Sequence, residues 1–336
     1  GLMIPVLALI SLGGGSFFEG LSILGSENPE YLRVLTQENL EGKQVSVPWP
    51  TLLTGMMFIQ IFYWSTNQVI VQRAMAAKSL AEGQKGVLFA SAMKLVGPLM
   101  LCLPGIIALH MPDLIIDKQD QVYGAVVRHV LPDWSLGLFA AVLMGSILSS
   151  FNSALNSAST LFSLQFYKGY INRAASEVDI VNVGKRFGIV LAIASIAIAP
   201  VLAQLDSIFQ YLQKVNGIYS VPIIAIFLLG ILTKHIPAVG AKIGMIVGFV
   251  SYAYFVFFPI ENLHWLHMYF ISFTWSVMIM LLIGYLNPKT QKEIEKSDER
   301  DPAPVDMTPW SKAKDASIAI VLATVVIYIL LSLAAS

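Results

Sequence analysis

The feature that most constrains this chain is a series of apolar runs, each about twenty residues long and bounded by charged or turn residues. A helix of this length crosses the hydrocarbon core of a bilayer. Hydrophobic residues make up 56% of the sequence and charged residues 12%, against about 25% charged in soluble domains. The chain is therefore predicted to be an all-α, multi-pass membrane protein, with a short amphipathic helix within 113–134. The predicted spans are 2–25, 49–72, 86–111, 135–166, 182–205, 208–233, 237–259, 264–286 and 315–335.

Charged residues orient these spans in the membrane. One alternating set of loops carries fifteen lysines and arginines and the other carries four, with Lys94 and Lys214 inside spans. The positive-inside rule makes the first set cytoplasmic, so the polar connection 287–314 is predicted to be a cytoplasmic linker of a plasma- or inner-membrane protein. A formal net charge of +0 gives no indication of a nucleic-acid partner, and the single cysteine, Cys102, excludes an internal disulfide.

Polar side chains crowd one of the predicted spans. A span that only anchors a protein avoids them, because an unpaired polar group in hydrocarbon costs several kcal/mol. This density therefore predicts contact with a polar ligand. The residues concerned are Gln60, Tyr63, Ser65, Thr66, Asn67 and Gln68.

Hydroxyl side chains line one face of the span 135–166. They recur at i, i+3, i+4, i+7, i+11 and i+14, a spacing that follows one side of an α-helix. Helix packing through small residues is an equally good interpretation for Ser157 and Thr160. For Ser149 and Ser150, with Ser146 one turn earlier, neutral oxygen ligands for Na⁺ are the favoured interpretation. The stripe comprises Ser146, Ser149, Ser150, Ser153, Ser157 and Thr160.

Lys94 places a charge inside a span, on the order of 13 Å of helix beyond Lys85 at the cytoplasmic edge. An intramembrane charge indicates a functional site, with snorkelling to the interface as the alternative. Pro98 lacks the N–H that would bond the Lys94 carbonyl, so it frees an acceptor at the same place.

The start of the span 208–233 combines amides with helix-breaking residues. Gly217 and Pro222 predict an interrupted helix that exposes backbone groups to a substrate, and Gln213 is the amide favoured as a ligand. A helix that simply starts at the membrane surface is the alternative.

An intramembrane hydrolase is excluded by the positions of the histidines. All five lie near span ends, and none forms the metal-binding His-Glu-x-x-His pair. The chain is therefore not expected to be an enzyme. The histidines are His110, His129, His235, His264 and His267.

Several motifs, in order and spacing, resemble the sodium/solute symporter family, and most closely its sodium/sugar cotransporters of the glucose and galactose type. The resemblance covers nearly the whole chain. Its motifs are residues 63–73 (YWSTNQVIVQR), 76–79 (AAKS), Lys94, 103–105 (LPG), Ser149 with Ser150, 155–158 (LNSA) and 210–213 (QYLQ).

This resemblance implies a LeuT-type core of two inverted five-helix repeats with extra helices at both ends. Residues 1–25 would be the fifth core helix, 49–233 the second inverted repeat, and 237–335 the C-terminal extra helices. The chain is accordingly expected to be a partial transporter domain of about nine transmembrane helices, truncated at its N-terminus.

The resemblance also implies a sugar site. Tyr63 would be the inner gate that closes over the sugar from the cytoplasmic side, with Trp64 as its stacking neighbour. Gln60, Lys94 and Gln213 would hydrogen-bond the sugar hydroxyls. Gln60 stands where relatives carry Asn or Thr, which leaves the identity of the sugar open.

A sodium site follows from the same resemblance, with Ser149 and Ser150 giving hydroxyls and Ser146 a carbonyl to Na⁺. The expected function is sodium-coupled symport of a sugar by alternating access. Symport of another small solute, such as an inositol or an acidic sugar, is the alternative. A non-transporting sensor or scaffold with the same fold is a candidate from a different class.

Overall fold

The computed structural model describes residues 1–27, 29–32, 47–114, 118–205, 207–261, 263–290, 294 and 305–334. This part of the chain is helical apart from turns and an isolated β-bridge. It divides into two compact units, Gly1–Tyr31 with Met93–Ile208 (unit 1) and Leu32–Ala92 with Phe209–Ser336 (unit 2). Most of the linker predicted over 287–314 lies outside the described residues.

Seven helices or paired helical segments of the described chain are long and apolar enough to span a membrane, which confirms seven of the nine predicted spans. A shorter helix, α7 (Val122–Val130), confirms the amphipathic helix predicted within 113–134. The seven are α5 (Leu80–Leu101) with α6 (Leu103–Ala108), α8 (Asp133–Leu161) with the π-helix η4 (Phe162–Ile171), α9 (Glu177–Leu202), α10 (Ile208–Leu232), α11 (Ala238–Phe257), α12 (His267–Leu286) and α14 (Ala313–Ala334).

The predicted span 2–25 is not one straight helix. It consists of α1 (Met3–Leu12) and α2 (Phe17–Ser26), whose axes are bent by 79°. Gly14 and Gly15 form the corner with φ of 59° and 110°, a left-handed region in which glycine avoids steric strain. Ser16 then caps α2 by accepting a hydrogen bond from the Glu19 N–H at 3.3 Å.

The predicted span 49–72 is also interrupted. The π-helix η2 (Leu52–Met56) leads into α3 (Met57–Ser65), and α4 (Gln68–Met75) starts after a two-residue break. Asn67 is extended there, and its side chain accepts from the Val69 N–H at 3.0 Å. The Thr66 hydroxyl donates to the Phe62 carbonyl at 2.9 Å. Two of the polar side chains in this span, those of Thr66 and Asn67, therefore provide hydrogen-bond partners for backbone groups at the break.

The interruption predicted in the span 208–233 is wrong, because α10 is continuous through Gly217 and Pro222. Gly217 has a different role, since it lets two aromatic rings approach the helix. A Cβ added there would lie 2.1 Å from Cε1 of Tyr269 and 2.6 Å from Cζ of Tyr252. The glycine is thus required by packing.

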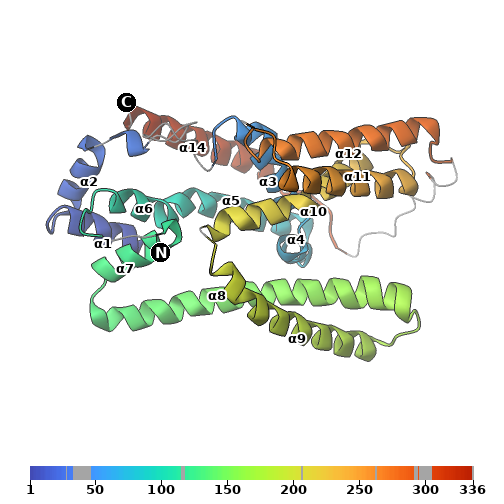
Figure 1. Ribbon diagram of the computed structural model, residues 1–336, viewed down its shortest axis with the longest axis horizontal. Helices are drawn as coiled ribbons and strands as arrows, with labels where there is room; N and C mark the ends of the chain where they lie inside the picture. The colour runs from blue at the N-terminus through green and yellow to red at the C-terminus, as the bar shows by residue number, and fades with distance from the viewer. Residues whose placement is uncertain are drawn as a thin grey trace. The chain divides into compact units, whose positions relative to one another are not determined.

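Within unit 2, α11 and α12 lie side by side (Figure 1). Glycines at four-residue intervals, Gly240, Gly244 and Gly248, are buried on α11. A Cβ on Gly244 would lie 2.3 Å from Cγ of Met280, so the backbones meet closely. The Ser276 hydroxyl donates to the Gly244 carbonyl at 2.9 Å. This is the small-residue packing that membrane helices use in place of hydrophobic association.

The segment that follows the linker contacts the start of α5, also in unit 2. The Asp306 carbonyl accepts from the Leu80 N–H at 2.9 Å, and the Trp310 N–H donates to Oε1 of Gln84 at 2.7 Å. Lys85 Nζ lies 5.9 Å from the centroid of the Trp310 ring. We refer to residues 305–310 as the strap.

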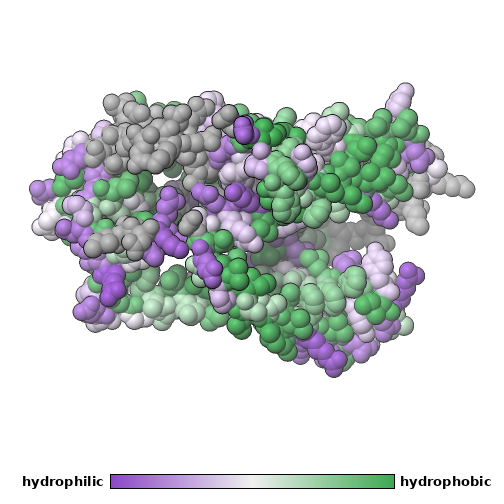
Figure 2. Space-filling model, in the orientation of Figure 1, coloured by the Kyte–Doolittle hydropathy of each residue, from purple (hydrophilic) through white to green (hydrophobic). Residues whose placement is uncertain are grey.

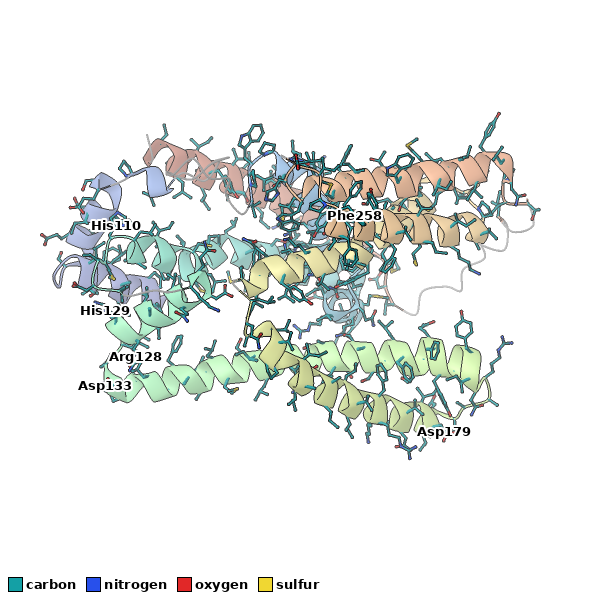
Figure 3. The ribbon with its side chains drawn as sticks, viewed as in Figure 1. His110, Arg128, His129, Asp133, Asp179 and Phe258 are labelled. Carbon is teal, nitrogen blue, oxygen red and sulfur yellow. The ribbon has the colours of Figure 1, made fainter. Side chains whose placement is uncertain are left out.

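In unit 1, α8 and η4 form a hairpin with α9. The Phe162 and Phe187 rings stack at a centroid distance of 3.9 Å. A capping box of Ser176 and Asp179 begins α9, with Asp179 at the end of the hairpin in Figure 3. Figure 2 shows apolar residues along the sides of these helices, as expected for surfaces that face lipid.

Candidate functional site

The helix α3 positions Gln60, Tyr63 and Trp64 immediately before the helix break. Gln60 and Trp64 are four residues apart on one face, and the Trp64 Nε1–H donates to Oε1 of Gln60 at 3.2 Å. The Tyr63 and Trp64 rings are 5.4 Å apart at 84°, so they meet edge to face instead of stacking. Their exposed fractions are 38% and 37%, which leaves both rings accessible within unit 2.

Gln213 on α10 belongs to the same unit and is half-buried. Its Nε2 donates to Sδ of Met56 at 3.9 Å. Met56 directly precedes α3, so this contact places Gln213 at the start of that helix, one turn before Gln60. The Tyr269 hydroxyl on α12 donates to the main-chain carbonyl of Gln213.

Lys94 lies in unit 1, on an exposed part of α5. Helix α5 starts at Leu80 and continues through Pro98, so on the order of 21 Å of helix precedes Lys94. The structure therefore brings four of the five predicted sugar ligands into unit 2 and describes the fifth in unit 1.

The three predicted sodium ligands lie together on α8 in unit 1. Ser146, Ser149 and Ser150 are all exposed within that unit. Further along the stripe, the Ser153 hydroxyl donates to the Ser149 carbonyl at 3.0 Å and the Ser157 hydroxyl to the Ser153 carbonyl at 2.9 Å. Ser157 is 3% exposed, which favours the packing interpretation at that position. Hydroxyl and carbonyl oxygens of the first three serines are suitable ligands for a hard cation.

Three of the five histidines make local side-chain contacts. No group of three or more His, Cys, Asp or Glu side chains that could hold a metal ion occurs within the described ranges. His110, labelled in Figure 3, has Nε2 2.6 Å from the Glu27 carbonyl. Thr54 Oγ1 lies 2.7 Å from Nδ1 of His267, and the His264 Nδ1 accepts from the Leu266 N–H at 3.3 Å.

The sequence analysis did not identify Tyr252 and Tyr269, the aromatic residues that pack against α10 next to Gln213. Tyr252 and Tyr269 are 1% and 0% exposed, on spans that were interpreted only as apolar. The available signal was the glycine spacing of α11, since Gly-x-x-x-Gly in an apolar segment predicts close helix packing.

Comparisons with known proteins identify the family of the chain. The model of the Sodium:solute symporter family matches residues 1–248. The uncharacterized symporter YidK of Escherichia coli is 40% identical over 98% of this chain and 56% of its own length. A sodium/glucose cotransporter of Vibrio parahaemolyticus is 33% identical over 78% and 51%. Sodium/myo-inositol cotransporter 2 of Oryctolagus cuniculus is 28% identical over 74% and 42%. The chain thus spans about half the length of the curated relatives it matches.

Proposed function

This chain belongs to the sodium:solute symporter family, and from that premise we propose that the full-length protein couples the entry of sodium to uptake of a sugar by alternating access. The fold proposed for it is a LeuT-type core, with 1–25 as the fifth core helix, 49–233 as the second inverted repeat and 237–335 as extra helices. Symport requires no covalent chemistry, so no residue is assigned a catalytic role.

The observation that carries the sugar assignment is the cluster of aromatic and amide side chains around α3. An amide offers both donors and an acceptor, which matches the mixed character of sugar hydroxyls. The Tyr63 and Trp64 rings supply apolar faces for the sugar ring, with Tyr63 as the inner gate. Gln60 contacts the Trp64 ring and Gln213 contacts Met56 at the start of the helix. Lys94 is proposed as the third hydrogen-bonding ligand.

Ser146, Ser149 and Ser150 are proposed as the sodium site. Sodium bound there stabilises the outward-facing state, and its release to the cytoplasm loosens the gate at Tyr63. The membrane potential contributes about 2.3 kcal/mol per charge per 100 mV. Because 1.4 kcal/mol corresponds to about a tenfold ratio, this drives more than tenfold accumulation.

The test is uptake of radiolabelled D-glucose and D-galactose by the full-length protein in proteoliposomes, with an inward sodium or potassium gradient. Uptake is expected only with sodium, and to be lost in Ser149→Ala and Lys94→Ala. Ser195→Ala is the matched control, because Ser195 is an exposed serine on the neighbouring span α9. Its hydroxyl donates a hydrogen bond to the Leu191 carbonyl.

Other outcomes separate the alternative functions. Sodium-dependent uptake of myo-inositol or an acidic sugar alone would keep the sodium site and remove the sugar assignment of Gln60, Lys94 and Gln213. The relative named as a myo-inositol cotransporter makes that the first alternative to test. Sodium or sugar binding without any uptake would favour a sensor or scaffold.

A further inference from the structure

Tyr269 is a fully buried tyrosine whose hydroxyl reaches the candidate substrate site. It lies on α12 with an exposed fraction of 0%, and its hydroxyl donates to the main-chain carbonyl of Gln213. A buried phenol hydroxyl needs such a partner, because desolvation without a hydrogen bond is costly. The partner here is the backbone of a proposed sugar ligand.

The fit between Tyr269 and α10 depends on Gly217, one turn beyond Gln213. A Cβ at this position would lie 2.1 Å from the Tyr269 ring, so any side chain would displace the ring from the helix. In an α-helix the N–H of residue 217 faces the carbonyl of residue 213. The ring and its hydroxyl therefore contact one and the same turn of α10.

Aromatic neighbours hold the Tyr269 ring in place. The Tyr252 ring of α11 lies 5.1 Å away, and the Trp265 ring lies 5.8 Å away at 82°. Tyr252 is itself 1% exposed. Two neighbouring rings and a glycine surface leave Tyr269 little freedom to reorient.

The side chain of Gln213 is held much more weakly than its backbone. Its amide nitrogen contacts the Met56 thioether at 3.9 Å, and sulfur is a weak acceptor. An incoming hydroxyl oxygen can displace such a contact easily. The backbone is thus fixed while the amide remains available.

We propose that Tyr269 is a positioning residue for substrate recognition, fixing the turn of α10 so that the Gln213 amide is directed toward α3. The proposal rests on the proposed function, in which Gln213 contacts the solute. It means that α11 and α12, outside the predicted inverted repeats, contribute to the specificity of the site.

The test is Tyr269→Phe in the full-length protein, which removes the hydroxyl and keeps the ring against Gly217. The KM for D-glucose or D-galactose is expected to rise about fivefold, while the maximal rate stays within about twofold. Tyr285→Phe is the matched control, because Tyr285 is on the same helix and 85% exposed. An unchanged KM in Tyr269→Phe would overturn the proposal.

A double-variant cycle separates positioning from general packing. In a Gln213→Ala background, Tyr269→Phe is expected to add less than about twofold to the KM, because no amide remains to be directed. An additional rise in KM of about fivefold in this background would show that Tyr269 acts through a residue other than Gln213. If wild-type protein transports sugar and Gln213→Ala alone has a normal KM, the role of Gln213 is refuted, and the positioning role of Tyr269 with it.

Hydrogen exchange provides a readout that does not need transport. The amides of residues 213–217 are expected to exchange about fivefold faster in Tyr269→Phe, with no change at Ile224 and Ala225 on the same helix. Equal exchange in the two proteins would overturn the positioning role. Absence of sugar uptake would refute the sugar assignment alone and leave this measurement to decide.

Discussion

At the scale of single residues, His264 is a titratable group that makes the stability of the protein depend on pH. It lies just before α12. It is half-buried, and its Nδ1 accepts a hydrogen bond from the Leu266 N–H. Burial lowers the pKa of His264 from its ordinary value of 6.5, with His267 and Lys214 contributing in the same direction. The folded protein therefore favours neutral His264.

This lowered pKa predicts loss of stability in acid. As pH falls, the unfolded chain takes up a proton at His264 before the folded protein does. The contribution of neutral His264 to the free energy of unfolding is therefore complete above about pH 6.5, and it is lost as pH falls from there toward the lower pKa of the folded state. We expect the free energy of unfolding in detergent to fall between pH 7.5 and 5.5, and less steeply in His264→Gln. His235→Gln serves as the control; an identical slope in His264→Gln and wild type would contradict the assignment.

Some site residues could be predicted from sequence and others could not, for a local reason. Gln60, Tyr63 and Trp64 are within one turn and a half of helix, so their shared neighbourhood follows from helical spacing. The contact between Tyr269 and Gln213 joins residues 56 apart, on helices whose packing angle no local pattern defines. The roles of all the predicted sugar and sodium ligands stay predictions.

At the scale of elements, the α11–α12 contact offers a matched pair of buried serines one turn apart on α12. Both are 0% exposed. The Ser276 hydroxyl bonds the Gly244 carbonyl, whereas the Ser272 hydroxyl has no hydrogen-bond partner in the described part of the chain. Substituting each serine separately distinguishes the free energy contributed by the hydrogen bond from that contributed by burial of the side chain.

Ser276→Ala is expected to lower the free energy of unfolding by about 0.6 kcal/mol, the average for hydrogen bonds between membrane helices. Ser272→Ala is expected to leave it unchanged or raise it, because an unpaired hydroxyl is removed. Reversible denaturation in mixed micelles measures both. A larger loss for Ser272→Ala would contradict the packing described for α12.

Hydropathy predicted the long helices well and their breaks poorly. A window of about twenty residues averages over a corner such as Gly14 and Gly15, so the span 2–25 was expected to be continuous. Conversely, Gly217 and Pro222 suggested a break in α10 where tight packing explains the glycine and the helix accommodates the proline. Whether a glycine bends a helix or admits a neighbour depends on tertiary contacts.

At the scale of the whole molecule, sodium should stabilise the full-length protein if the α8 serines bind it. A ligand at ten times its dissociation constant adds about 1.4 kcal/mol to the free energy of unfolding. We expect a higher thermal unfolding temperature in sodium than in potassium chloride, and no such difference in Ser149→Ala. Equal temperatures for the wild type at saturating salt would argue against a sodium site.

The strap has a consequence for how the protein is made. Gln84 and Trp310 are 226 residues apart in sequence. At roughly 5 to 20 residues per second, the ribosome finishes Trp310 roughly 11 to 45 s after Gln84. During that interval the start of α5 lacks its strap, and a chain that stalls before residue 305 never acquires it. The first two turns of α5 therefore obtain their full set of hydrogen bonds only after residue 310 has been synthesised.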